Sequence, residues 1–218
     1  MDDLNISKLP TANSNMPITA EEKLEVIENA TKAYEAYLDA LRIDWRNDPN
    51  SADTPRRVAK AFVNDLAKGC YDEAPRITAF PSDGYDGMVF QGGIPVKSLC
   101  SHHHLAFTGV AHVAYIPSLT GHVVGLSKLN RIVEHFASRP QIQEGLTVQI
   151  QKAIDETCLG NKGVAVEISA THTCACLRGV KHDGCEMKTA RLSGDFLNDA
   201  STRSEFYSFI NQWYQNRR

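Results

Sequence analysis

The stretch LAFTGVAHVAYI, residues 105–116, is apolar at nearly every position and carries the β-branched and aromatic side chains that favour a β-strand. A second stretch, Gly163–Cys174, places Val164, Val166 and Ile168 at alternate positions, so that a strand puts all three on one face. Patterns of helical period occupy the sequence between these two stretches. Two strands separated by two helices predict an α+β fold.

The helices around these strands are predicted from apolar spacing and from end signals. The first intervening helix begins near Ser127, which can cap it, and the second begins at Pro140 and ends before Gly160. An apolar stripe from Phe206 to Trp213 predicts a helix at the C-terminus. The Pro- and Gly-rich segment over 71–93 is predicted as loops and short strands. The predicted order of this region is therefore two strand-like segments, two helices, strand, loop and helix.

The N-terminal part differs from this sheet region in composition and in the period of its apolar residues. Two amphipathic helices are predicted over 20–43 and 54–68, and the residues before them are rich in Asn, Ser, Pro and Asp. The chain therefore divides into an arm over 1–17, a helical part over 18–69 and a sheet domain over 70–218.

Composition limits the classes of function. The chain has 218 residues, is 42% hydrophobic and carries a formal net charge of −3. It has no apolar run of roughly eighteen residues and no basic, apolar leader, so we expect a cytoplasmic protein that does not enter a membrane. The acidic balance disfavours nucleic acid as a partner but is compatible with a local basic pocket for a phosphorylated ligand.

Two short motifs concentrate His and Cys side chains, which are common zinc ligands. The motif CSHHH, residues 100–104, pairs a thiol with an imidazole at Cys-x-x-His spacing, a combination that suits zinc. The motif HTCAC, residues 172–176, follows the second predicted strand, where alternation is expected to place its His and both Cys on one face. Together the two motifs predict a metal site.

The number of ligands decides what kind of site this is. Three ligands, Cys100, His103 and either Cys174 or Cys176, leave a fourth position open for water, as in catalytic zinc sites. All four ligands together close a structural site. Spacing alone supports both alternatives.

Charged residues elsewhere suggest a polyanionic ligand. Lys128 and Arg131 lie three residues apart in the first turns of a predicted helix, where free N–H groups also favour an anion, although a solvated basic face is the alternative. Arg178 and Arg57 are further cations that taken singly favour surface roles. Glu144 at a helix start suits the helix dipole, and a carboxylate can also accept two N–H donors from a guanine edge.

With these motifs in place, the sequence resembles the GTP cyclohydrolase I family. The resemblance runs in one collinear order from about residue 54 to the C-terminus. Its most specific part is the long central stretch. The matching stretches are TPRRVAK (54–60), LCSHHH (99–104), VAYIPS (113–118), VVGLSKLNRIVEHFASRPQIQEGLTVQI (123–150) and THTCACLRGV (171–180).

The resemblance implies a zinc ion held by Cys100, His103 and Cys174, with the fourth position open to water. It also implies that His172 is the general acid at N7 of the purine and that His102 assists ring opening and the ribose chemistry.

The resemblance further implies how the substrate is held. Glu144, with Gln143 beside it, would recognise guanine. Arg57 would reach the triphosphate from a neighbouring subunit. The remaining contacts to ribose and triphosphate would be Ser127, Lys128, Arg131 and Arg178.

The reaction implied is hydrolysis of GTP to formate and 7,8-dihydroneopterin triphosphate, with Zn²⁺ as the cofactor. The fold implied is the tunnelling fold, an antiparallel sheet with paired helices, in a ring-forming homo-oligomer, a decamer with active sites between subunits. The product could enter folate, pterin-cofactor or deazaguanine biosynthesis, and the sequence does not choose among them.

Two residues depart from the family pattern. Ser101 stands where a Glu commonly follows the zinc Cys, which removes a carboxylate able to orient an imidazole and predicts lower turnover or metal affinity. His104 follows the His pair and is a rival ligand, although strand alternation would point it away from His103.

Other functions compete with the zinc hydrolase. One is a relative that keeps a purine or pterin pocket but uses a Cys nucleophile on a deazapurine nitrile. Retention of Cys100, His103 and Cys174 argues against it. Another is a structural zinc protein in which Cys176 is the fourth ligand. A zinc-finger-like nucleic-acid module is disfavoured by the acidic charge.

Overall fold

The computed structural model describes residues 11–217, so most of the arm expected over 1–17 lies outside the described residues. The chain forms two compact units, Met1–Ala74 and Pro75–Arg218. Within the described part, no helix is long and apolar enough to cross a membrane.

The first unit is helical. Helix α1, Ala20–Ala40, begins with a reciprocal capping box between Thr19 and Glu22. Helix α2, Thr54–Ala61, passes into a π-helical turn over Phe62–Leu66, and a short α3 follows over Lys68–Tyr71. The helix predicted over 54–68 is therefore broken near its end. A small core of Ile27, Ala59 and Val63 joins α1 to α2.

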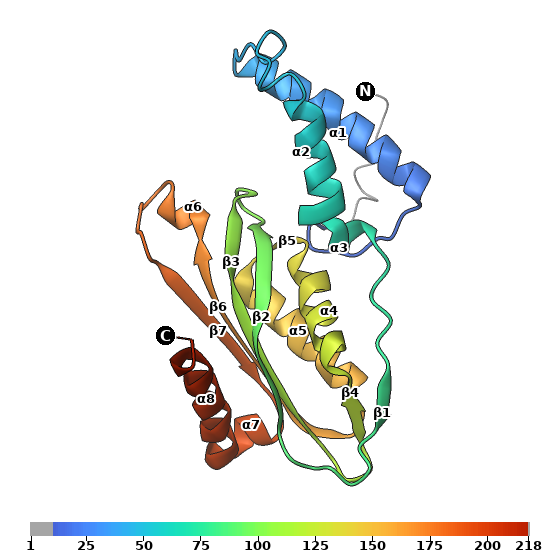
Figure 1. Ribbon diagram of the computed structural model, residues 1–218, viewed down its shortest axis with the longest axis vertical. Coiled ribbons are helices and arrows are strands. Elements are labelled where there is room, and N and C mark those ends of the chain that lie inside the picture. The colour runs from blue at the N-terminus through green and yellow to red at the C-terminus, as the bar shows by residue number, and fades with distance from the viewer. Residues whose placement is uncertain (1–10, 218) are drawn as a thin grey trace. The chain divides into compact units, whose positions relative to one another are not determined.

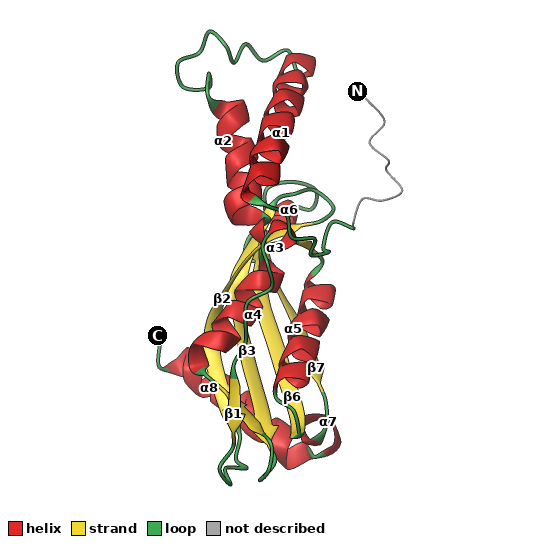
Figure 2. Cartoon of the chain, turned by 90° about the vertical axis from the view of Figure 1, so that its right-hand side faces the viewer, coloured by secondary structure: helices red, strands yellow, loops and turns green. Residues whose placement is uncertain are grey.

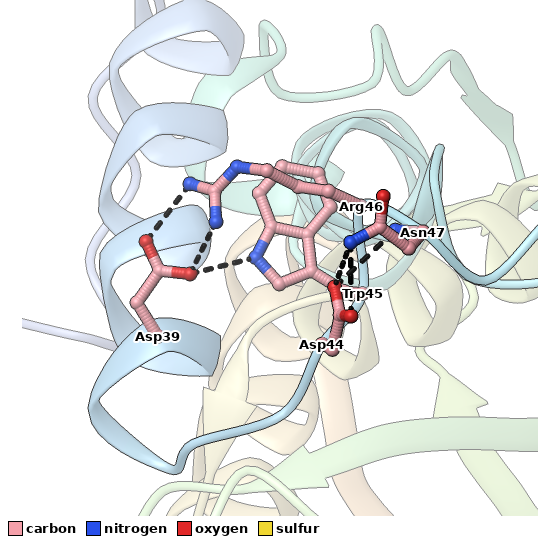
Figure 3. Close-up of polar contacts among 5 residues, drawn as sticks. All are labelled: Asp39, Asp44, Trp45, Arg46 and Asn47. Atoms are coloured by element: carbon pink, nitrogen blue, oxygen red, sulfur yellow. Dashed lines mark hydrogen bonds and ion pairs between the residues drawn. The ribbon is translucent and has the colours of Figure 1, made fainter.

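A polar group closes the loop after α1. The carboxylate of Asp39 accepts hydrogen bonds from Trp45 Nε1 at 3.0 Å and from the two terminal guanidinium nitrogens of Arg46 at 2.6 and 2.8 Å (Figure 3). Asp44 accepts from the Asn47 side chain in the same loop. These contacts hold the indole ring of Trp45 against the end of α1.

The second unit is built on a five-stranded sheet in the order β5-β2-β3-β6-β7 (Figure 1). All neighbours are antiparallel except the short β5, which runs parallel to β2. A separate two-stranded sheet pairs β1 with β4. The bounds are β1 Ala79–Pro81, β2 Val89–Cys100, β3 Ala106–Pro117, β4 His122–Val124, β5 Pro140–Gln141, β6 Asn161–His172 and β7 Glu186–Leu192.

Helices cover both faces of this sheet, as Figures 1 and 2 show. Helices α4, Leu126–Ala137, and α5, Gln143–Thr157, bury their apolar stripes against alternate residues of β3 and β6. On the opposite face, α7, Asp195–Asn198, and α8, Ala200–Gln215, pack on the remaining alternate residues. Because both faces are covered, the strands are apolar at successive positions, which explains the near-continuous run in β3.

The structure corrects several predicted boundaries. Gly125, rather than Ser127, is the N-cap of α4, and α5 begins at Gln143 because Pro140 lies in strand β5. Strand β7 was predicted as loop, because its exposed edge leaves charged and polar residues at most of its positions. Strand β6 ends at His172, and the chain turns at once into the short helix α6, Thr173–Cys176.

Candidate active site

The topology of the sheet brings the two metal-ligating motifs together. Strands β2 and β6 are both antiparallel to β3, so they are parallel to each other and end at the same edge of the sheet. Cys100 is the last residue of β2, and Cys174 lies in α6 directly after β6. With His103, one ligand atom from each of these residues lies within 4.8 Å of the others.

The turn after β2 positions His103. The backbone N–H groups of His103 and His104 both donate to the carbonyl oxygen of Cys100, at 3.3 and 2.8 Å. His104 has φ +51°, a left-handed conformation that is uncommon for a residue other than Gly. The group of three ligand atoms does not include His104, nor does it include Cys176, within the part of the chain that the structure describes.

The donor set suits a soft or borderline divalent cation. Two thiols and an imidazole are the ligands that zinc prefers in three-ligand sites. Burial and a hydrogen bond with Cys100 raise the pKa of Cys174, so two neighbouring thiolates need a compensating positive charge. Arg178 donates to Nε2 of His103 at 2.7 Å, and that lone pair cannot serve a metal ion at the same time. Coordination through Nε2 therefore releases the guanidinium of Arg178.

His172 lies at the end of β6, two residues before Cys174. Its ring stacks on Phe107 of β3, with centroids 4.5 Å apart and planes 8° from parallel. Its Nε2 lies 2.7 Å from Oε1 of Gln143. Burial lowers the pKa of His172, and the negative charge of Glu144 opposes this shift. The ring is therefore held in place, and burial favours its neutral form.

The other predicted site residues are distributed over several elements. Ser127, Lys128 and Arg131 occupy the first turns of α4, where Lys128 Nζ donates to the carbonyl of Arg76 at 3.1 Å. Glu144 is exposed in the first turn of α5.

The remaining residues predicted for the site have local partners of their own. His102 Nδ1 lies 3.6 Å from Cys100 Sγ. Arg57 belongs to α2 in the helical unit, where it makes an ion pair with Asp53 at 3.3 Å.

Two contacts around His172 were missed by sequence reasoning. The first is the stacking of Phe107, which depends on the pairing of Phe107 with His172 across β3 and β6. The second is the hydrogen bond that His172 Nε2 donates to Oε1 of Gln143, whose amide is buried rather than directed to solvent. Strand register would have revealed the first contact, but no local pattern signals the second.

Comparison with known proteins agrees with this site. Residues 30–211 match the family described as GTP cyclohydrolase I. The GTP cyclohydrolase 1 of Aeromonas salmonicida is 41% identical over 191 residues, covering 87% of this chain and 84% of that protein. That of Coxiella burnetii is 45% identical over 179 residues, covering 80% of this chain and 95% of that protein. That of Flavobacterium johnsoniae is 40% identical over 206 residues, covering 94% of this chain and 89% of that protein.

Proposed function

The chain belongs to the GTP cyclohydrolase I family, and on this premise we propose that it is a zinc-dependent enzyme that hydrolyses GTP to formate and 7,8-dihydroneopterin triphosphate. The observation that carries the proposal is the convergence of Cys100, His103 and Cys174 within 4.8 Å, at the strand end that also holds His172. In this group Cys100 is buried, Cys174 is half-buried and His103 is exposed, so one side of it is open to solvent. Two thiols, one imidazole and a neighbouring second imidazole in that setting suit hydrolysis better than a closed structural site.

We assign the metal to Cys100, His103 and Cys174. A zinc ion held there would supply a Lewis acid and a water nucleophile at neutral pH. His172 would take up a proton and pass it to N7 as the five-membered ring of the purine opens, and His102 would assist the later steps on the ribose.

The charged side chains hold the nucleotide. Glu144, exposed at the start of α5, accepts N–H donors from the guanine edge. Lys128, Arg131 and Arg178 bind the triphosphate, and Ser127 contacts the ribose. We also propose that Arg57, which lies in the helical unit, serves the site of a neighbouring subunit, as the family resemblance implies, in a ring-forming homo-oligomer with the tunnelling fold. We expect this assembly to be a decamer in the cytoplasm.

The direct test is to incubate purified protein of measured zinc content with GTP, following formate release and pterin fluorescence with and without a chelator. Formate and pterin in equal amounts, both lost on chelation, are the expected result. Bound zinc without either product would contradict the proposal and favour the structural site. Turnover of a deazapurine nitrile in place of GTP would favour the nucleophilic-cysteine alternative.

A further inference from the structure

The side chain of Gln143 is oriented by the sheet beneath it. The residue is 1% exposed. Its Nε2 lies 3.0 Å from the carbonyl oxygen of Ile168, 2.9 Å from that of Met187 and 3.2 Å from Oγ1 of Thr189. Carbonyl oxygens only accept hydrogen bonds, so the nitrogen of the amide must face them. The opposite orientation would place the amide oxygen of Gln143 against the carbonyl oxygens of Ile168 and Met187, with no hydrogen between them.

This orientation determines which ring nitrogen of His172 carries a proton. The amide oxygen of Gln143 lies 2.7 Å from Nε2 of His172 and has only lone pairs to offer. Nε2 must therefore carry a hydrogen, whether the ring is neutral or protonated. The remaining nitrogen, Nδ1, is the one that this contact leaves available to a substrate.

Two contacts then fix the ring. Stacking on Phe107 sets the plane of the imidazole, and the bond to Gln143 sets its rotation within that plane. Gln143 is also the first residue of α5 and directly precedes Glu144. The same helix start thus aligns the proton donor and the carboxylate assigned to guanine.

We propose that Gln143 is a positioning residue, which holds His172 with a proton on Nε2 so that Nδ1 delivers the proton to the substrate. This inference rests on the proposed function. It gives the Gln143 side chain a role in orienting His172 in place of the direct contact with guanine that the family resemblance implies. In the step itself, Nδ1 takes up the proton that the attacking water loses and passes it to N7 of the purine; the Nδ1 lone pair is then restored, and the bond from Nε2–H to Gln143 persists throughout.

The test compares two substitutions on one helix. Gln143→Met keeps the length of the side chain but removes the amide. Gln151→Met is the matched control, because Gln151 is also buried in α5 and its Nε2 donates to Ser193 Oγ at 3.0 Å without touching a histidine. We expect Gln143→Met to lower kcat for GTP by about 10- to 100-fold with little change in KM, and Gln151→Met to leave both nearly unchanged. Equal kcat values for the two variants would overturn the proposal.

A second measurement is independent of turnover. Imidazole ¹⁵N spectra of the zinc-loaded, unsubstituted protein at pH 8, assigned with a His172→Gln variant, report which nitrogen carries the proton. We expect the Nε2–H tautomer at His172 and its loss in Gln143→Met. A proton on Nδ1 would overturn the proposal even where Gln143→Met fails to fold. Absence of formate from the unsubstituted protein would instead contradict the proposed function. The tautomer of His172 would still show whether Gln143 orients its ring.

Discussion

His172 and His112 lie on neighbouring strands of one sheet, and burial lowers the pKa of both, yet their surroundings differ. His172 stands at the strand end, with Nε2 bonded to Gln143 and with Nδ1 as the atom that we propose acts on the substrate. His112 lies in the middle of β3 under α8 and is fully buried. A shifted pKa is thus common to both residues. Only the first combines it with an oriented ring and access from solvent, which is what a catalytic group requires.

The buried region under α8 is incompletely bonded. Nδ1 of His112 accepts the N–H of Gly93 at 3.3 Å, so Nε2 carries the hydrogen. That atom lies 4.0 Å from Oε2 of Glu167, too far for a direct hydrogen bond, and neither has a partner among the described residues. The rings of Phe90, Trp213 and Tyr214 enclose the imidazole. We therefore expect His112 and Glu167 to affect the stability of the fold, and the residues at the end of β6 to affect activity.

The largest effect is expected at the strand end. Cys174→Ser removes a ligand, and we expect bound zinc to fall from about one per chain to near zero and formate release to fall by roughly a hundredfold or more. Cys176→Ser is the matched control, two residues away in the same turn of α6, and should keep both metal and activity. Zinc content by atomic absorption and the GTP assay give the two readouts. Loss of zinc in Cys176→Ser would indicate the closed four-ligand site.

This pair of cysteines also shows how far the sequence could lead. The spacing of Cys100 and His103 indicated one pair of candidate ligands, and the structure brings both into the group that could hold a metal ion. The expectation that Cys174 follows along a strand was wrong, since β6 ends at His172 and Cys174 lies in α6. Spacing alone left Cys174 and Cys176 equivalent. Only the pairing of β3 with both β2 and β6, a property of the whole sheet, brings the two motifs to one edge.

The fold was predictable where burial leaves a periodic pattern. Strand β3 and the helices α4 and α5 follow such patterns, although their ends do not, because Gly125 and Pro140 act through backbone geometry. Strand β7 was missed because hydrogen bonds to β6, rather than apolar side chains, define it. The contact of Gln143 with His172 joins residues far apart in the sequence and depends on the register of that same strand.

An intermediate effect is expected from His112, measured as the pH dependence of stability. Burial, aided by the positive charges of Lys188 and Arg217, lowers its pKa from 6.5 to about 4. The unfolded chain binds this proton near pH 6.5 and the folded chain only near 4, so the free energy of unfolding falls between those pH values, by on the order of 3 kcal/mol. Urea unfolding from pH 8 to 4 should show a smaller loss in His112→Gln than in the unsubstituted chain.

Glu167 provides the opposing control for this measurement. Burial raises the pKa of Glu167, so the folded chain takes up this proton before the unfolded chain does, and stability rises as the pH falls through that range. Glu167→Gln removes this gain and should make the loss on acidification steeper. If the unsubstituted chain, His112→Gln and Glu167→Gln all showed the same pH dependence of stability, the pKa shifts that burial implies for His112 and Glu167 would be contradicted.

The smallest effect is expected at a third polar group, around Asp39, which is fully bonded but exposed. Its carboxylate accepts from Trp45 and Arg46, which lower the pKa of Asp39, and Arg46 also lies 4.2 Å from the Trp45 ring (Figure 3). Water competes for these bonds, so Asp39→Asn should lower the unfolding temperature only slightly while shifting the fluorescence of Trp45. Asp44→Asn, in the same loop but bonded to Asn47, should leave that fluorescence unchanged. Asp39→Asn could instead lower the free energy of unfolding as much as acidification does through His112. Hydrogen bonding would then matter more for stability than burial, and burial would no longer explain why the two histidines differ.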